Sequence, residues 1–254
     1  MELVRRKLVS SRTEAQRAID AGLVRVGTNT EPKASTLVAS DEPVHIASLP
    51  EPFVSRAGRK LDAAFDAFDV NPFGKTVIDV GASTGGFTDC ALQRGASHVV
   101  AVDVGYGQMH WQVRSDERVS VVERTNIRTA DPSKLGAPFD LIVGDLSFIS
   151  LAMISEQLSA LGSDGSDWLL LIKPQFEAGK DGVGKGGIVR DPDVRIDTIR
   201  SVAEAFSQHG LSIHGLIVSP ITGTTGNVEY VAWFRHGDPR DVETLIAALE
   251  ETAP

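Results

Sequence analysis

The sequence predicts an α/β protein in which a doubly wound, mostly parallel sheet of seven strands follows a small N-terminal α+β domain. Over most of the chain, apolar runs of strand length alternate with segments of helical spacing, the pattern of parallel α/β folds. A glycine-rich loop directly follows the first of these runs. Pro50 and Pro52 separate this region from the N-terminal segment. We therefore expect a small domain at residues 1–49, a linker at 50–57 and a Rossmann-like domain at 58–254.

The composition is ordinary for a globular protein, with 254 residues of which 42% are hydrophobic and 23% charged. Its single cysteine, Cys90, excludes a disulfide framework and fits a reducing compartment. No apolar run approaches the roughly 20 residues that span a bilayer, and the charged N-terminus does not resemble a signal peptide. We expect a cytoplasmic protein without a stable membrane partner and without a bound metal.

The N-terminal segment is expected to form two short helices followed by two short strands. The first helix covers residues 2–8, and the second follows a capping box in which Ser11 is the N-cap and Glu14 lies three residues on. The strands are expected at 23–26 and 44–46. Residues 1–60 contain ten Lys and Arg against seven Asp and Glu although the whole chain has a net charge of −9, so this region could bind phosphates locally.

After the linker, a helix is expected over residues 60–68 because its apolar residues fall on one face. The strands that follow are expected at 76–80, 98–104, 119–123, 140–144, 168–172, 212–218 and 228–235, and the helices at 85–94, 150–161, 192–209 and 239–250. No helical segment separates the last two strands. They should therefore form an antiparallel pair at one edge of the sheet.

The glycine-rich loop after the first strand of the sheet indicates a nucleoside cofactor. Gly81, Gly85 and Gly86 let a ligand approach bare backbone between a strand and a helix. Asp103 closes the next apolar run, where nucleotide-binding α/β folds hold ribose hydroxyls. Position 83 is Ser, which departs from the G-x-G-x-x-G fingerprint and favours S-adenosylmethionine over NAD. The alternative is an ordinary turn of an unrelated α/β enzyme.

Asp79, on the strand before the loop, is expected to receive the ammonium group of the methionine moiety. The residues assigned to cofactor binding are Asp79, Gly81, Ala82, Ser83, Gly85, Gly86, Phe87, Asp103, Val104, Asn126 and Asp145.

Four charged side chains stand out beside this loop. Asp145 follows one apolar strand, and Lys173 ends another because Pro174 cannot donate to the ladder. Glu229 is the only charge in the apolar run 228–234, and Lys60 opens the helix before the sheet. Each alone could be a surface lysine, a helix cap or a turn residue. Together, at the carboxyl edge of a sheet, they could exclude water and transfer a proton.

These four residues resemble the Lys-Asp-Lys-Glu tetrad of ribose 2′-O-methyltransferases of the FtsJ/RrmJ type. Six strings that cover nearly the whole chain resemble the TlyA family: 55–61, 81–88, 103–108, 145–150, 173–177 and 226–230. Residues 11–19 and 22–26 resemble the RNA-binding module that this family shares with a ribosomal small-subunit protein. The basic lead-in that usually precedes this module is missing, which would either weaken RNA binding or place the true start upstream.

The resemblance implies a cytidine 2′-O-methyltransferase that uses S-adenosyl-L-methionine and acts on ribosomal RNA of the small and often the large subunit. It implies Lys60, Asp145, Lys173 and Glu229 as catalytic residues. We assign Lys173, in its neutral form, as the base. Burial and Lys60 favour the neutral amine, whereas Asp145 and Glu229 favour the ammonium, which would only orient the hydroxyl. Asp145 would position Lys173 or the methyl end of the cofactor, and Glu229 would hold Lys60 or the ribose.

Basic side chains are expected to meet RNA phosphates, with a merely solvated helix face as the alternative. Residues 177–190 contain five glycines and could form either a basic flap beside Lys173 or a surface loop. The expected RNA-binding residues are Arg5, Arg6, Arg12, Arg17, Arg25, Arg56, Arg59, Lys180 and Lys185. The competing functions are a membrane-active protein, since family members are also described as haemolysins, a non-catalytic RNA-binding factor, and a nicotinamide-dependent oxidoreductase.

Overall fold

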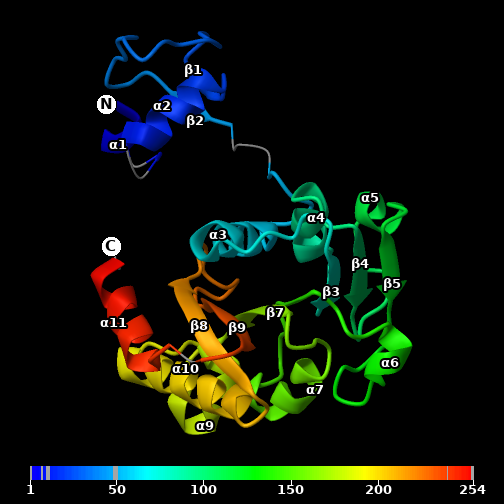
Figure 1. Cartoon of the computed structure of the whole chain (residues 1–254). Helices are drawn as coiled ribbons and strands as arrows, with labels where there is room; N and C mark the ends of the chain where they lie inside the picture. Colours follow the sequence, from blue (N-terminus) through cyan, green and yellow to red (C-terminus); the bar gives the residue numbers. More distant parts are fainter. Residues whose placement is uncertain (1, 7, 10–11, 48–50, 239, 253–254) are drawn as a thin grey trace. The chain divides into compact units, whose positions relative to one another are not determined.

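The computed structural model describes residues 2–6, 8–9, 12–47, 51–238 and 240–252, and the chain divides into two compact units, Met1–Glu51 and Pro52–Pro254. In the first unit, α1 (Glu2–Arg5) and α2 (Arg12–Asp20) precede an antiparallel pair, β1 (Val24–Val26) and β2 (Val44–Ile46) (Figure 1). Its core consists of Leu3, Ala15, Ala18, Val24 and Val26. The predicted N-cap, Ser11, and Pro50 of the predicted linker lie outside the described residues.

The described part of the second unit contains one seven-stranded sheet in the order β5-β4-β3-β6-β7-β9-β8. Its strands are β3 (Thr76–Val80), β4 (His98–Val102), β5 (Val119–Val122), β6 (Leu141–Gly144), β7 (Asp167–Ile172), β8 (Leu211–Val218) and β9 (Tyr230–His236). Neighbouring strands from β5 to β7 are parallel, whereas β9 runs antiparallel to both β7 and β8. The predicted α/β class, the mostly parallel sheet and the antiparallel pair at its edge are confirmed.

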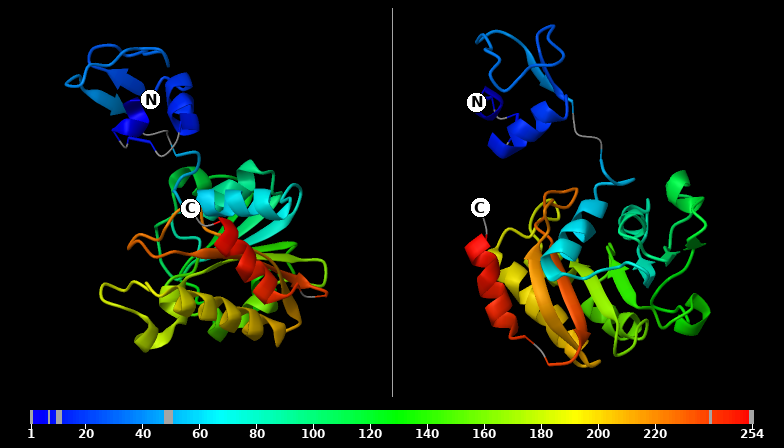
Figure 2. Two further views of the ribbon diagram at one scale, coloured as in Figure 1. Left: turned by 90° about the vertical axis from the view of Figure 1, so that its left-hand side faces the viewer. Right: turned by 45° about the horizontal axis from the view of Figure 1, so that its top comes forward.

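Helices cover both faces of this sheet (Figures 1 and 2). On one face, α3 (Gly58–Phe68) and α4 (Gly86–Gln93) pack on the strands, and on the other lie α10 (Pro192–Ser207) and α11 (Val242–Thr252). Alternate strand residues point to the two cores; Val77 belongs to the core under α3 and Ile78 to the core under α10. The remaining helical segments are short: α5 (Trp111–Arg114), α6 (Pro132–Leu135), η1 (Ala152–Ile154), α7 (Ser155–Ser159), α8 (Pro174–Glu177) and α9 (Gly179–Gly182).

Several boundaries differ from the sequence prediction. The helix expected at 150–161 is a 3₁₀ turn, η1, followed by the short helix α7. Glu229 lies just before β9 rather than inside it, although its carbonyl still accepts from Ser219 N. The segment 52–57, predicted as linker, belongs to the second unit: Phe53 is buried against α3, and Val54 N donates to Asp89. In the described residues, no helix is both long and apolar enough to cross a membrane.

Gly81 is the residue that lets the end of β3 approach the end of β6. Its φ is +83°, which disfavours other residues, and a Cβ there would lie 3.2 Å from the carbonyl oxygen of Asp145. The glycine therefore brings the first loop of the sheet into contact with the segment that holds Asp145.

The carboxyl group of Asp79, on β3, is buried in the core below the glycine-rich loop. Its side chain is 0% exposed, Oδ2 accepts from Thr88 Oγ1 at 2.6 Å, and Oδ1 has no hydrogen-bond partner among the described residues. Burial raises the pKa of Asp79 to about 7. The sequence assigned this residue to a ligand ammonium group, but the structure places it behind the loop, bonded to α4.

The substitution Asp79→Asn is expected to stabilise the protein, relative to wild type, increasingly as the pH rises from about 5 to about 7. The pKa of Asp79 is about 7 when folded against an ordinary value of 3.8, so the folded state keeps a proton that the unfolded chain has lost. The wild type therefore loses about 1.4 kcal/mol of stability per pH unit in this window, and the asparagine variant does not. Urea unfolding followed by tryptophan fluorescence measures the difference, because every tryptophan lies in the second unit.

The matched control is Asp140→Asn. Asp140 directly precedes β6 and therefore lies at the amino ends of the parallel strands, whereas Asp79 lies near their carboxyl ends. Asp140 accepts hydrogen bonds from Thr76 N at 2.8 Å and Thr76 Oγ1 at 2.7 Å, which lower its pKa. This variant should gain no stability as the pH rises. An advantage of Asp79→Asn that stays constant from pH 5 to pH 7 would show that Asp79 does not retain a proton in the folded protein.

Candidate active site

In the described part of the chain, two adjoining cavities open at the carboxyl ends of the parallel strands. We call them the Lys173 cavity, of about 560 Å³, and the Asp103 cavity, of about 590 Å³. The residues common to both linings are Gly81, Ser83, Asp145, Ser147 and Phe148. The loop after β6 is therefore a wall between the two cavities, and ligands in the two would lie next to each other.

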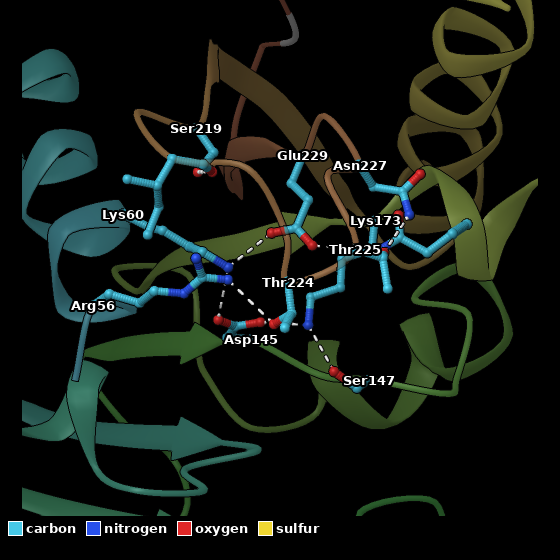
Figure 3. Close-up of polar contacts among 12 residues, drawn as sticks. Arg56, Lys60, Asp145, Ser147, Lys173, Ser219, Thr224, Thr225, Asn227 and Glu229 are labelled. Carbon is cyan, nitrogen blue, oxygen red and sulfur yellow. Dashed lines mark hydrogen bonds and ion pairs between the residues drawn. The ribbon is translucent and has the colours of Figure 1, made fainter. Parts of the chain in front are cut away.

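The Lys173 cavity brings together the four charged residues singled out in the sequence (Figure 3). Lys60, on α3, places Nζ 2.7 Å from Glu229 Oε2 and 3.2 Å from Asp145 Oδ2. Lys173, directly after β7, places Nζ 2.6 Å from Asp145 Oδ1. The two lysines thus share one aspartate, and the second carboxylate lies on the far side of Lys60.

This network is largely withdrawn from water. Lys60, Lys173 and Glu229 are 6%, 7% and 2% exposed. Two ammonium groups next to two carboxylates leave the group electrically balanced, which is the condition under which charges tolerate burial. Glu229 Oε1 accepts a further hydrogen bond from Gln175 Nε2 at 3.2 Å. A Cβ at Gly223 would lie 2.6 Å from that same oxygen, so glycine at this position makes room for the carboxylate.

The sequence did not indicate the hydroxyl partner of Lys173. Lys173 Nζ donates to Ser147 Oγ at 2.7 Å, whereas its contact with Asp145 Oδ1 lies outside hydrogen-bond angles and is an ion pair only. The missed signal was the position of Ser147, two residues after Asp145 in a string already singled out. Gln175 and Phe176 were missed in the same way: both lie in the string 173–177, after Lys173 and Pro174, and both line the Lys173 cavity.

The Asp103 cavity is formed by the loops after β3, β4, β5 and β6. Asp103 accepts from Ser83 N at 2.7 Å through Oδ2 and from Gly105 N at 2.6 Å through Oδ1, which joins two of these loops. Of the residues assigned to cofactor binding, those that line this cavity are Gly81, Ser83, Asp103, Val104, Asn126 and Asp145. Ala82, Gly86 and Phe87 line the Lys173 cavity instead. Asp79 and Gly85 line neither, because Asp79 is buried and Gly85 caps α4.

The residues assigned to RNA binding fall into different surroundings. Arg5 and Arg6 pair with Glu2, and Arg6 also donates to the carbonyls of Ala39 and Glu42, so both arginines support the first unit itself. Arg12 and Arg25 are exposed on that unit, and the side chain of Arg17 lies outside the described residues. The structure therefore gives Arg5 and Arg6 an intramolecular role that the sequence did not indicate.

In the second unit, Arg56 lines the Lys173 cavity and donates to Thr224 Oγ1 at 3.1 Å. Lys180 and Lys185 are exposed on the glycine-rich segment, and Arg59 on α3 lines neither cavity.

The glycine-rich segment 177–190 is attached to the Lys173 cavity. It contains α9 and a bridge between Gly184 and Ile188, and Val183 and Gly187 line the cavity. Asn227, 1% exposed, accepts from Val189 N at 3.0 Å and donates to Gly187 O at 2.8 Å. The segment is thus bonded to the loop that leads to Glu229. Among the described residues, no group of three or more His, Cys, Asp or Glu side chains could hold a metal ion.

Comparison with known proteins places this geometry in a family. The model of the FtsJ-like methyltransferases matches residues 53–236. The 16S/23S rRNA (cytidine-2′-O)-methyltransferase TlyA of Mycobacterium tuberculosis is 46% identical over 92% of this chain and 88% of its own length. Hemolysin A of Brachyspira hyodysenteriae is 38% identical over 88% of this chain and 93% of its own. A solved structure described as a hemolysin from Streptococcus thermophilus is 35% identical, with a TM-score of 0.75, over 96% of this chain and 92% of that one. The chain belongs to the FtsJ-like methyltransferases and, within them, to the family of the TlyA proteins.

Proposed function

We propose that this protein transfers a methyl group from S-adenosylmethionine to the 2′-hydroxyl of a cytidine in ribosomal RNA, in the cytoplasm. The observation that supports the proposal most strongly is the meeting of Lys60, Asp145, Lys173 and Glu229 in a cavity that adjoins a second cavity built around Asp103. The substrate follows the activity by which the relative from Mycobacterium tuberculosis is known.

S-adenosyl-L-methionine is the cofactor of this family, and the residues present fit it. The Asp103 carboxylate faces a cavity with apolar walls, including Ile127 and Leu146, which suits a nucleoside. In the adjoining cavity, Ser55 Oγ is buried without a hydrogen-bond partner among the described residues, beside Gly86 at the start of α4. Such a hydroxyl suits the polar amino-acid end of the ligand. When bound, the cofactor supplies a methyl group on a sulfonium, an electrophile that needs alignment and a deprotonated partner.

Lys173 is the base in this proposal. Its Nζ is held by the Ser147 hydroxyl and the Asp145 carboxylate, which leaves a further side of the nitrogen for a ribose hydroxyl. Lys173 would first give up the ammonium proton of its ion pair to water; the neutral amine would then take the hydroxyl proton onto Nζ while the oxygen bonds to the methyl carbon and the methyl–sulfur bond breaks. The ammonium so formed lies 2.6 Å from Asp145 Oδ1, and this ion pair stabilises it.

Lys60 and Glu229 maintain this arrangement. Glu229 is 2% exposed and its Oε2 lies 2.7 Å from Lys60 Nζ, which supports a role in holding Lys60 rather than the ribose. Lys60 in turn lies 3.2 Å from Asp145 Oδ2 and so fixes the carboxylate that faces Lys173. For RNA contacts we propose the exposed cations: Arg12 and Arg25 on the first unit, and Arg56, Lys180 and Lys185 on the second.

The substitution Lys173→Ala is expected to lower the methylation rate about 10²- to 10⁴-fold, because it removes the base. Lys173→Arg should be equally inactive, since a guanidinium stays charged and cannot accept the proton. Primer extension at low nucleotide concentration, on rRNA from cells with each variant, measures the modification. The matched control is Lys134→Ala, whose side chain is 83% exposed and should not affect the rate. Methylation that survives in Lys173→Ala would remove this residue from the role of base.

The substitution Asp103→Ala is expected to weaken the binding of S-adenosylhomocysteine about 10- to 100-fold. It removes the carboxylate that would accept the ribose hydroxyls and that holds Ser83 N and Gly105 N. Titration calorimetry gives the dissociation constant, with Asp164→Ala in an exposed loop as control. Thermal stabilisation of the wild type by S-adenosylmethionine but not by NAD is expected in the same preparation. Unchanged affinity in Asp103→Ala would refute the assignment of this cavity.

A further inference from the structure

Two segments of the active site are joined at two points. The first segment runs from Asp145 to Leu151 after β6, and the second from Lys173 to Glu177 after β7. At one point, Lys173 Nζ donates to Ser147 Oγ at 2.7 Å. At the other, Glu177 accepts from Ser150 Oγ at 2.6 Å and from Leu151 N at 2.7 Å. Lys173 and Glu177, which are four residues apart, therefore both hold the loop after β6.

Glu177 is an unusual residue for this position. Burial raises its pKa, and both of its oxygens accept hydrogen bonds from the loop after β6, with no ion pair to a cation in the described part of the chain. Placing a carboxylate in such surroundings costs free energy unless hydrogen bonds satisfy it. Here the loop supplies those bonds, so the conformation of the loop and the position of Glu177 depend on each other.

The loop between Ser147 and Ser150 contains a residue in a strained backbone conformation. Phe148 has φ +63°, a conformation that is strained for a bulky residue and persists only where the surroundings impose it. It directly follows Ser147, so this strained position helps to set where Ser147 lies. Glu177 holds the loop just beyond it, at Ser150 and Leu151.

Ser147 is also the directional partner of the base. The contact between Lys173 Nζ and Asp145 Oδ1 is short but lies outside hydrogen-bond angles, whereas the bond to Ser147 Oγ satisfies them. The carboxylate supplies charge, and the hydroxyl fixes the rotation of the amine about its last bond. That rotation determines which side of the nitrogen faces the cavity.

We propose that Ser147 and Glu177 act together as positioning residues for methyl transfer: Ser147 orients the nitrogen of Lys173, and Glu177 holds the loop that presents Ser147. This inference rests on the proposed function. Neither residue exchanges a proton with the substrate in this scheme, and their removal misaligns the base without removing it.

The first test compares Ser147→Ala with Ser147→Thr in single-turnover methylation of rRNA by the full-length protein. The alanine variant is expected to lower the rate about tenfold, with the affinity for S-adenosylhomocysteine within twofold of wild type. The threonine variant keeps the hydroxyl and should recover the rate to within threefold. Ser97→Ala, which removes a hydroxyl bonded to Lys75 O at the amino end of the sheet, is the matched control with an unchanged rate.

The second test adds Glu177→Gln and the double variant. Glu177→Gln is expected to lower the rate about tenfold, and the double variant no more than about thirtyfold, because both substitutions release one loop. The thermal unfolding of Glu177→Gln is compared with that of Asp140→Asn. The carboxylate of Asp140, like that of Glu177, accepts hydrogen bonds from a hydroxyl and an amide of a neighbouring segment. If Glu177→Gln does not fold, Ser150→Ala, which removes one of the two hydrogen bonds from the loop to Glu177, takes its place alone and in the double variant.

The outcomes separate this inference from the proposed function. A wild-type rate for Ser147→Ala, no recovery by Ser147→Thr, or a double variant slowed about a hundredfold would overturn the joint positioning role. A wild-type protein that binds S-adenosylmethionine but methylates no rRNA would instead overturn the proposed function, and the variants would then not be compared.

Discussion

Four buried charges that neutralise one another are the constraint on which the rest of this structure depends. Two ammonium groups and two carboxylates lie in one cavity wall at distances of 2.6 to 3.2 Å, and three of the four side chains are almost completely withdrawn from water. Burial of one such charge without its partner would cost several kcal/mol. Each member therefore requires the other three, and the fold has to deliver all of them to one place.

The sheet topology explains how it does so. β6 and β7 are parallel neighbours, so Asp145 and Lys173, which follow them, reach the same edge. β9 runs the opposite way, with Tyr230 opposite Ile172, so the residue just before β9 lies at the edge where β7 ends. Glu229 is that residue. Because β9 is antiparallel to β7, a residue at the start of β9 lies at the same edge of the sheet as the residues that follow the parallel strands.

The sequence predicted this much of the site because strand ends are visible in it. Apolar runs mark the strands, and the charges that follow them mark the edge at which ligands of α/β proteins bind. It could not predict the hydrogen bonds that orient those charges. Asp79 shows the limit: its place before a glycine-rich loop suggested a ligand contact, but Thr88, in the first turn of α4, donates to its Oδ2 and burial keeps it from the cavities. The loop before η1 shows the same limit, because its Ser150 Oγ and Leu151 N donate to Glu177, which comes from another part of the sequence.

The loop after β6 links the two halves of the proposed reaction. Gly81 brings it against the end of β3, and its residues Asp145, Ser147 and Phe148 line both cavities. Methyl transfer needs donor and acceptor in contact at one point with the base beside them, which two cavities lined by the same loop can provide. A loop that touches both ligands must hold its shape when either is absent. The strained φ of Phe148 and the half-buried Glu177 can be understood in these terms: both restrict the loop before any ligand binds, so less ordering remains to be done when the substrates meet.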